Sequence, residues 1–157
     1  MALAVSRDDL GAWLLKANPN VWDVRALVDS GERRLTSWAV QRNYRSALMR
    51  PGDRVLFWVS GDGRTGVTRG LWGDGEIVAE AEDWVDAEQG LWLADGARQA
   101  VRARVEVDIH VWDSPVTVAE LRAHGVDDLE VLRLPVGANP SWLSRAQLRA
   151  VEELMLR

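Results

Sequence analysis

The pattern of apolar and polar positions along the chain predicts a mixture of strands and helices. The clearest strand covers residues 54–60, where the apolar run from Val55 to Val59 is unbroken. Such a run is typical of a strand buried on both faces of a sheet. Residues 101–109 alternate strictly between apolar and charged side chains, which predicts a half-buried strand with one wet face. Further strands are predicted at residues 12–16, which form a short apolar run, at 36–40, at 66–79, which are strand-like but rich in glycine, and at 131–135.

Helices are indicated by periodicity and by residues that cap helix ends. Apolar spacing predicts one helix over residues 21–28, ended by Gly31, and another over residues 44–49, stopped by Pro51 and Gly52. Residues 117–120 and 144–147 fit capping boxes, which start helices running to about His124 and to near the C-terminus. The last helix is expected to bury Leu148, Val151, Leu154 and Met155. We find no repeat or linker, so residues 1–157 are expected to form a single α+β domain.

Composition narrows the class of protein. The chain has 157 residues, of which 47% are hydrophobic and 27% are charged, as in ordinary globular domains. It contains no cysteine, which excludes disulfides and thiolate chemistry. No apolar run approaches a membrane span, and the first residues lack the basic leader of a signal peptide, so we expect a cytoplasmic protein without a membrane partner. Arginine outnumbers lysine 18 to 1, which indicates a GC-rich genome and a bacterial origin.

Charge is unevenly distributed along the chain. The net charge is −5, yet residues 33–69 hold eight arginines against Asp53 and Asp62. The acidic tract at residues 80–95 is expected to be an exposed excursion between strands. A local basic surplus can mark a nucleic-acid footprint, or it can simply solvate a surface, and the sequence leaves both interpretations open. The candidate phosphate contacts in this segment are Arg42, Arg45 and Arg50.

Nine of the eleven aromatic residues are tryptophan. We expect Trp13, Trp22, Trp112 and Trp142 to pack in the core, because they flank apolar elements. Three others lie within or just after the arginine-rich segment, namely Trp38, Trp58 and Trp72. Flat aromatic faces beside positive charge are what a protein needs to stack an unpaired base and hold its phosphates. Because side chains alternate along a strand, Phe57 and Trp58 must face opposite sides, so that one of them is core.

Catalytic and metal-binding patterns are missing from the sequence. His110 and His124 are the only histidines, and neither stands in a zinc-binding spacing. The glycines near residues 61–63 and 70–75 lack the spacing of a phosphate-binding loop or a dinucleotide fingerprint. We therefore expect a binding protein with no catalytic residue, metal or cofactor.

Five segments resemble the EVE family, relatives of the YTH readers within the PUA-like superfamily. They are residues 13–19 (WLLKANP), 37–40 (SWAV), 50–60 (RPGDRVLFWVS), 70–78 (GLWGDGEIV) and 135–140 (PVGANP). The resemblance implies a PUA-like mixed β-barrel flanked by short helices, with an aromatic pocket that takes up a modified base extruded from DNA or RNA. It makes Trp38 a pocket wall and Trp58 a pocket candidate. Asp74 departs from the family pattern, which usually has an apolar residue there.

The resulting hypothesis is a non-enzymatic, monomeric reader of nucleic acid carrying a modified base. The expected pocket comprises Trp38, Trp58, Trp72, Ser60, Asn18, Lys16 and Asn139, whereas Asp53 is expected to be structural. Two alternatives remain open. The same pocket can bind a free nucleoside or a similar flat ligand, or a small nucleotide-processing enzyme can recruit Asp74 or His110 as an acid or base.

Overall fold

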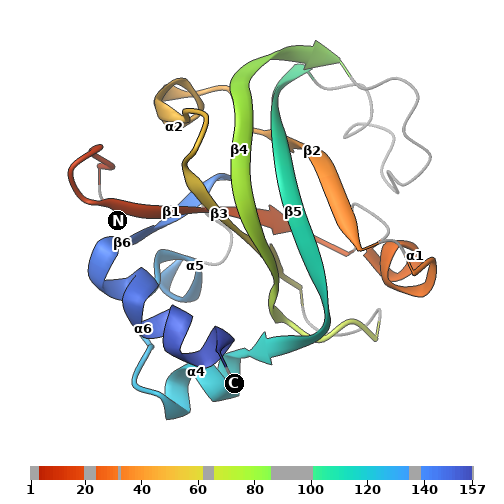
Figure 1. Cartoon of the computed structure of the whole chain (residues 1–157), viewed down its shortest axis with the longest axis vertical. Helices are drawn as coiled ribbons and strands as arrows, with labels where there is room; N and C mark the ends of the chain where they lie inside the picture. The colour runs from red at the N-terminus through yellow and green to blue at the C-terminus, as the bar shows by residue number, and fades with distance from the viewer. Residues whose placement is uncertain are drawn as a thin grey trace.

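The computed structural model describes residues 4–19, 24–31, 33–61, 66–85, 101–134 and 139–156. A strongly curved sheet forms its centre, and helices lie at its ends and edges (Figure 1). The strands are β1 Leu10–Ala17, β2 Arg34–Val40, β3 Arg54–Val59, β4 Gly70–Val85, β5 Val101–Thr117 and β6 Ser141–Ser144. The helices are α1 Val24–Asp29, α2 Tyr44–Leu48, α4 Val118–Ala123, α5 Glu130–Arg133 and α6 Arg145–Met155.

The six strands form one mixed sheet in the order β2-β5-β4-β3-β1-β6. β1 and β3 run parallel, and the other neighbouring pairs are antiparallel. The α+β class is confirmed, but the expectation of a closed barrel is wrong. The outer strands β2 and β6 do not pair with each other as a ladder in the described sheet. Isolated hydrogen bonds connect this side instead, such as that from the Trp38 indole Nε1 to the Lys16 carbonyl oxygen at 3.3 Å.

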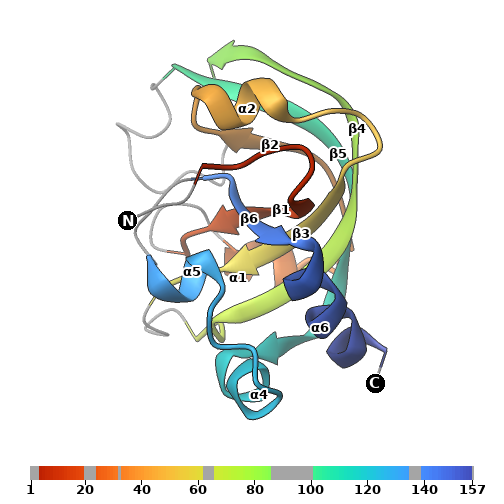
Figure 2. The same cartoon turned by 90° about the vertical axis from the view of Figure 1, so that its left-hand side faces the viewer.

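Both faces of the sheet are covered, which explains the unbroken apolar run of β3. Val55, Phe57 and Val59 pack in one core cluster with residues of β1, β2, β4 and β5. Leu56 and Trp58 pack in a second cluster on the other face, with side chains from α4, α5 and α6. These three helices gather at the same end of the molecule (Figure 2). The five side chains from Val55 to Val59 have no exposed surface, as the sequence predicts.

Most predicted elements are confirmed, with shifted ends. The strand predicted over residues 101–109 continues to Thr117, and β4 extends through Glu80 and Glu82 to Val85, so the acidic tract begins within a strand. The remainder of that tract, the start of the first predicted helix, Trp22 and most of the loop at residues 61–63 lie outside the described residues.

Two short elements differ from the prediction. Residues 130–133 form the helix α5, not a strand, and the strand β6 at Ser141–Ser144 is not evident from the sequence. So short a segment satisfies either geometry, because length is what separates helix from strand. Here Leu129 and Val131 pack into the second core cluster, and this tertiary contact decides the conformation.

Of the two predicted capping boxes, the one at the start of α6 is complete and the one at the start of α4 is not. The Ser144 hydroxyl accepts the Gln147 backbone N–H at 3.2 Å, and the Gln147 side chain accepts the Ser144 N–H at 2.9 Å. At α4 the Thr117 hydroxyl also caps, but it donates to the Glu120 carboxylate, so the reciprocal bond is not formed. No helix in the described part of the chain combines the length and apolar character that crossing a membrane requires.

Candidate functional site

Several of the predicted polar residues meet where the parallel strands β1 and β3 end. Lys16 and Asn18 lie at the end of β1, and Ser60 directly follows β3. The Ser60 backbone N–H and its hydroxyl both donate to the Ala17 carbonyl, at 2.9 and 3.2 Å. Gly61 follows with a φ of 102°, and a side chain there would meet the Pro19 ring at 3.2 Å. The turn after β3 therefore depends on glycine to approach β1.

Trp38 stands beside this strand end on β2. Its indole Nε1 donates to the Lys16 carbonyl oxygen at 3.3 Å. Its ring meets Phe57 nearly at right angles, at 81° with centroids 5.1 Å apart. The side chain is only partly buried against the first core cluster. Trp38 is thus held in one orientation while part of its surface remains accessible.

Asn139 joins β1 to β2 beside Trp38. Its Oδ1 accepts the Lys16 backbone N–H at 3.2 Å, and its Nδ2 donates to the Ala39 carbonyl at 3.3 Å. Its backbone carbonyl also accepts the Gln41 N–H at 2.7 Å, and its backbone N–H donates to the Gln41 side chain at 3.3 Å. These four hydrogen bonds tie Asn139 to β1 and to the end of β2, which makes it a brace of the site.

The predicted cage of three tryptophans is not assembled. Trp58 has no exposed surface and lies in the second cluster, on the opposite face of the sheet from Phe57 and Trp38. Its ring lies 6.0 Å from the guanidinium carbon of Arg69. Trp72 shares the first cluster with Trp38 but is only 7% exposed, and its Nε1 donates to the Thr68 carbonyl at 2.7 Å. Strand alternation places Phe57, and not Trp58, on the face of Trp38.

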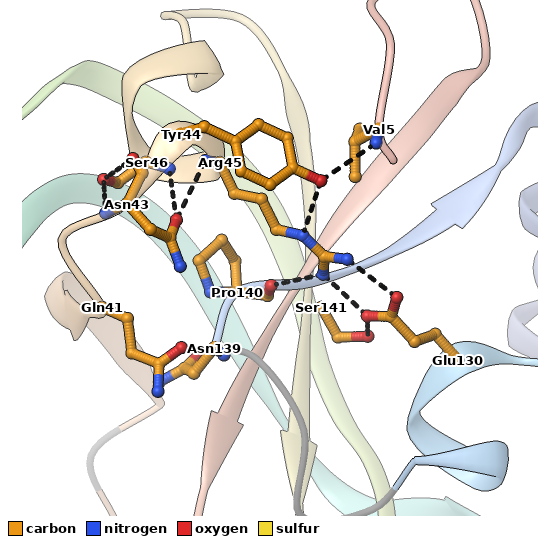
Figure 3. A network of polar contacts seen from close by, with 10 residues as sticks. All are labelled: Val5, Gln41, Asn43, Tyr44, Arg45, Ser46, Glu130, Asn139, Pro140 and Ser141. Carbon is orange, nitrogen blue, oxygen red and sulfur yellow. Dashed lines mark hydrogen bonds and ion pairs between the residues drawn. The ribbon is translucent and has the colours of Figure 1, made fainter. Parts of the chain in front are cut away.

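Arg45 is misassigned as a phosphate contact. Its side chain is 3% exposed and forms a two-pronged ion pair with Glu130, at 2.7 and 2.9 Å. The same guanidinium donates to the Pro140 carbonyl at 3.1 Å. Figure 3 shows this guanidinium pointing inward at Glu130. The sequence gives no sign of the pairing, because Glu130 lies 85 positions away.

Other arginines of the basic segment differ in their exposure and in their contacts. Arg42 and Arg50 are exposed, as a phosphate contact requires. Carboxylates neutralise three more: Arg33 pairs with Asp113 at 3.1 Å, Arg34 with Asp108 at 2.8 Å and Arg54 with Asp74 at 3.3 Å. The surplus of positive charge in the sequence is therefore not a continuous basic face.

Arg42 also borders a hollow that the sequence did not indicate. It has a volume of about 400 Å³ and is lined by Arg42, Asn43, Ser46, Ala47, Ala81, Glu82 and Ala103. This volume lies within the range of ligand pockets. The three alanines come from α2, β4 and β5, so their small size has no local signature. The hollow lies beyond the C-terminal end of β2, a short distance along the chain from Trp38.

Burial changes the electrostatics of Lys16. Its partial removal from water lowers the pKa of the ammonium, and the charge of Arg45 acts in the same direction, while that of Glu130 opposes both. Lowering by burial means that Lys16 has lost part of its hydration. A partly desolvated cation at the strand end suits an acceptor oxygen or an anion, since little further hydration must be removed on binding.

The two aspartates that the sequence highlights are engaged in structural contacts. Asp53 accepts the Arg7 guanidinium at 2.6 and 2.7 Å and the Trp13 indole at 3.0 Å, as its expected structural role requires. Asp74 accepts the Trp112 indole at 2.9 Å besides its contact with Arg54. Its departure from the family pattern is thus matched by a polar partner. Among the described residues, no three side chains of the metal-ligating types gather into a possible metal site.

Comparison with known proteins identifies relatives of similar length. The EVE domain family matches residues 11–154. A structure from Leishmania major, described as a hypothetical protein, is 22% identical with a TM-score of 0.56, over 97% of this chain and 100% of that one. The DUF55 domain of human thymocyte nuclear protein 1 is 18% identical with a TM-score of 0.56, over 91% and 97%. A protein from Pseudomonas syringae is 17% identical with a TM-score of 0.54, over 91% and 98%.

A search of curated proteins gives no match. The structural likenesses, all below 25% identity, concern the fold alone. The family match is of a different kind, since it spans nearly the whole chain and includes every described strand except the first residue of β1. The chain therefore belongs to the EVE domain family.

Proposed function

We propose that this protein is a single-domain, cytoplasmic and monomeric reader that binds nucleic acid carrying a modified base, which it takes up beside Trp38. The observation that carries the proposal is the state of Trp38, whose ring is oriented by Lys16 and Phe57 while part of it stays accessible. An aromatic ring fixed in this way offers a stacking surface without a large loss of side-chain entropy on binding.

Recognition combines stacking with polar contacts. Stacking of a base on an aromatic side chain is worth about 1–3 kcal/mol, and extrusion of a paired base costs a few kcal/mol. At the strand end the Asn18 amide supplies a donor for the edge of the base, and the Ser60 hydroxyl, whose proton goes to the Ala17 carbonyl, supplies an acceptor. The Lys16 ammonium belongs to the other face of β1, in register with Trp58, and adds positive charge near the strand end. Because Asn139 already holds both strands, its role in the proposal is to fix this geometry. Trp72 supports the Trp38 cluster from within the core.

Phosphate contacts are assigned to the two exposed arginines, Arg42 and Arg50. Arg42 also borders the hollow beyond β2, which gives a neighbouring nucleotide room. Membership of the EVE family supports a PUA-like binding module, since EVE domains are generally binding modules and not enzymes. The buried Arg45 has no part in phosphate binding.

The test is a screen of the full chain against oligonucleotides that differ only in one modified base, in single-stranded and duplex form. Fluorescence anisotropy measures Kd for DNA and RNA versions at about 50 and 200 mM salt. We expect at least one modified strand to bind about tenfold more tightly than its unmodified match, a preference of about 1.4 kcal/mol. Affinity should fall with salt, because phosphate contacts release counterions.

Two outcomes would contradict the proposal. If no modified strand binds better than its unmodified match, the site is not a reader of base modification. If a free modified nucleoside competes as well as the oligonucleotide and salt has no effect, the ligand is a small molecule and phosphates are not recognised.

A further inference from the structure

We infer that the buried pair of Arg45 and Glu130 positions the candidate site, by holding residues 139–141 so that Asn139 joins β1 to β2 around Trp38. This inference rests on the proposed function for its effect on ligand affinity. Its structural half concerns the brace itself and can be measured without a ligand. Neither residue touches the ligand, so both are positioning residues.

The pair is anchored on three sides. The Arg45 guanidinium grips both carboxylate oxygens of Glu130, at 2.7 and 2.9 Å. Its Nε lies 3.4 Å from the Tyr44 hydroxyl, which also accepts the Val5 backbone N–H at 3.2 Å. The Ser141 hydroxyl donates to the same Glu130 carboxylate at 2.8 Å. The pair thereby ties α2, α5, β6 and the N-terminal segment to one point (Figure 3).

From this point, one hydrogen bond reaches the backbone next to Asn139 and another reaches the side chain of Ser141. Arg45 donates to the Pro140 carbonyl at 3.1 Å, and Ser141 is held through Glu130. Pro140 and Ser141 directly follow Asn139, whose position they set through the chain. The Asn139 side chain in turn accepts the Lys16 N–H of β1 and donates to the carbonyl of Ala39, which follows Trp38 on β2.

Asn139 continues the sheet beyond the end of β6. The β1–β6 ladder pairs Leu14 with Ser141, two residues before Lys16. The Lys16 N–H is next in line on that side of β1, and the Asn139 side chain accepts it where the ladder stops. A displacement of residues 139–141 would therefore release Lys16, and with it the carbonyl that orients the Trp38 indole.

The chemistry of the pair favours positioning over simple packing. Two buried charges must be desolvated, so an apolar pair of the same size often serves stability equally well. The planar guanidinium of Arg45 instead fixes the orientation of the two side chains, because its donors bind the carboxylate in one plane. One further donor remains for the Pro140 carbonyl. Both charges also act on the Lys16 ammonium, with opposite signs.

The first experiment compares Arg45→Lys with Arg7→Lys. Arg7 provides a matched control, since it also forks onto a carboxylate, that of Asp53, and donates to one backbone carbonyl, that of Leu48 at 3.2 Å. It contacts none of residues 139–141 in the described structure. We expect Arg45→Lys to weaken binding of the modified oligonucleotide about tenfold, and Arg7→Lys to change it less than about twofold.

A double-mutant cycle separates positioning from general stability. If Arg45 acts through Asn139, Arg45→Lys should lose most of its effect on Kd in an Asn139→Ala background. Additive effects would overturn the inference. Should Arg45→Lys fail to fold, Ser141→Ala replaces it in the same cycle, because it removes only one hydrogen bond of the network and leaves the ion pair in place.

Hydrogen exchange of the Lys16 amide gives a readout without any ligand. We expect about tenfold faster exchange in Arg45→Lys and in Asn139→Ala, but not in Arg7→Lys. If the wild-type protein binds none of the oligonucleotides while Lys16 protection falls as expected, the proposed function fails and the positioning role stands. If Lys16 protection and ligand affinity are both unchanged in the Arg45 and Ser141 variants, the pair does not position the site.

Discussion

The tryptophans whose side chains are described differ in how much of their surface is exposed and in what they contact. Trp13, Trp58 and Trp72 are buried in the core clusters. Trp112 and Trp142 are half-buried like Trp38. Trp112 packs against the second cluster and gives its indole N–H to Asp74, and Trp142 packs against the first cluster from β6. Trp38 combines partial exposure with a hydrogen bond to the end of β1. This contrast provides a matched pair of substitutions.

Trp38→Ala should weaken binding of the modified oligonucleotide by about 1–3 kcal/mol, the worth of one base–aromatic stack. Its preference for the modified over the unmodified strand should largely disappear. The slope of affinity against salt should be unchanged, because the phosphate contacts remain. Anisotropy titrations at several salt concentrations measure both quantities.

Trp112→Ala serves as the control, because it removes an indole of similar burial from the other face of the sheet. We expect it to lower the free energy of unfolding without changing the preference for the modified base. Equal losses of preference in the two variants would show that Trp38 acts only through folding. Circular dichroism melts of both variants test whether the fold survives.

The buried carboxylate of Glu130 connects stability to pH. Burial raises its pKa, but hydrogen bonds from Arg45 and Ser141 and the charge of Arg45 outweigh this, so the pKa lies below its ordinary value of 4.5. A lowered pKa in the folded state means stability that is present above the unfolded value and lost as pH falls through the folded one. The pair should therefore stabilise the protein at neutral pH and fail in acid.

Glu130→Gln should cost about 3–5 kcal/mol at neutral pH, since it leaves the Arg45 charge buried without its partner. The difference from wild type should shrink as the pH falls below about 4.5, because Glu130 takes up a proton there in the unfolded chain and only at lower pH in the folded protein. Denaturant unfolding from about pH 3 to 7 measures this. A difference that is constant across this range would contradict the assigned ion pair. Residual acid sensitivity is expected from Asp53, whose pKa is lowered as well.

At the level of elements, α6 shows how a predicted stripe divides once it is packed. Val151 and Leu154 are buried in the second cluster, whereas Leu148 and Met155 are only partly buried against it. The spacing of apolar residues correctly predicts which side of the helix faces the sheet. The spacing cannot predict how deeply each of these side chains is buried, because that depends on how far the sheet extends beneath each turn of the helix.

The same substitution at two sites of α6 tests this division. Leu154→Ala should lower the free energy of unfolding by about 2–5 kcal/mol, as expected for a core leucine. Leu148→Ala should cost less, because its side chain already contacts water and leaves a smaller cavity. Urea denaturation with a common slope compares the two variants. An equal or larger loss for Leu148→Ala would show that the start of the helix is the better packed end.

Strands and helices differ in how far they are predictable here. β3 and β5 follow from their patterns, because a buried or alternating run of six or more residues fits few other conformations. The segment at residues 131–135 is short and interrupted by Arg133, so its pattern does not decide, and α5 forms there through contacts of Leu129 and Val131 with distant elements. β6 is four residues long and exists because β1 offers an edge for it.

For the molecule as a whole, the basic surplus of residues 33–69 in the sequence does not become an equal surplus of positive charge in space. Four arginines of the basic segment pair with carboxylates that lie 20 to 85 positions away, namely Arg33, Arg34, Arg45 and Arg54. We expect the exposed Arg42 and Arg50 to contribute to the attraction of a polyanion. Charge counts along a chain cannot show which charges cancel in space.

Charge reversal at these two positions tests the reduced footprint. Arg42→Glu combined with Arg50→Glu should weaken binding of modified and unmodified oligonucleotides alike. The slope of log K against log salt should decrease by up to about 2, since each phosphate contact contributes about 0.9. Arg34→Glu is the control, because Arg34 is exposed but already paired with Asp108. A slope that is unaffected by the double reversal would move the footprint elsewhere.

Local chemistry was enough to predict much of this protein from its residues. The buried strand β3, the wet face of β5, the cap of α6 and the turn chemistry of the EVE motifs each depend on neighbours within a few positions. The expectation that Phe57 and Trp58 face opposite sides of the strand also follows from this local geometry. The family was recognisable for the same reason, because these local patterns occur in a particular order.

The assembly of the site depended on contacts between residues far apart in the chain. Burial of Arg45 by Glu130, the bracing of Lys16 by Asn139 and the hydrogen bond between Trp38 and Lys16 span 85, 123 and 22 positions. No local pattern encodes which face of a strand meets another strand's tryptophan. The open sheet is also a result of long-range packing, because its closure would require β2 and β6 to pair after every other element has packed.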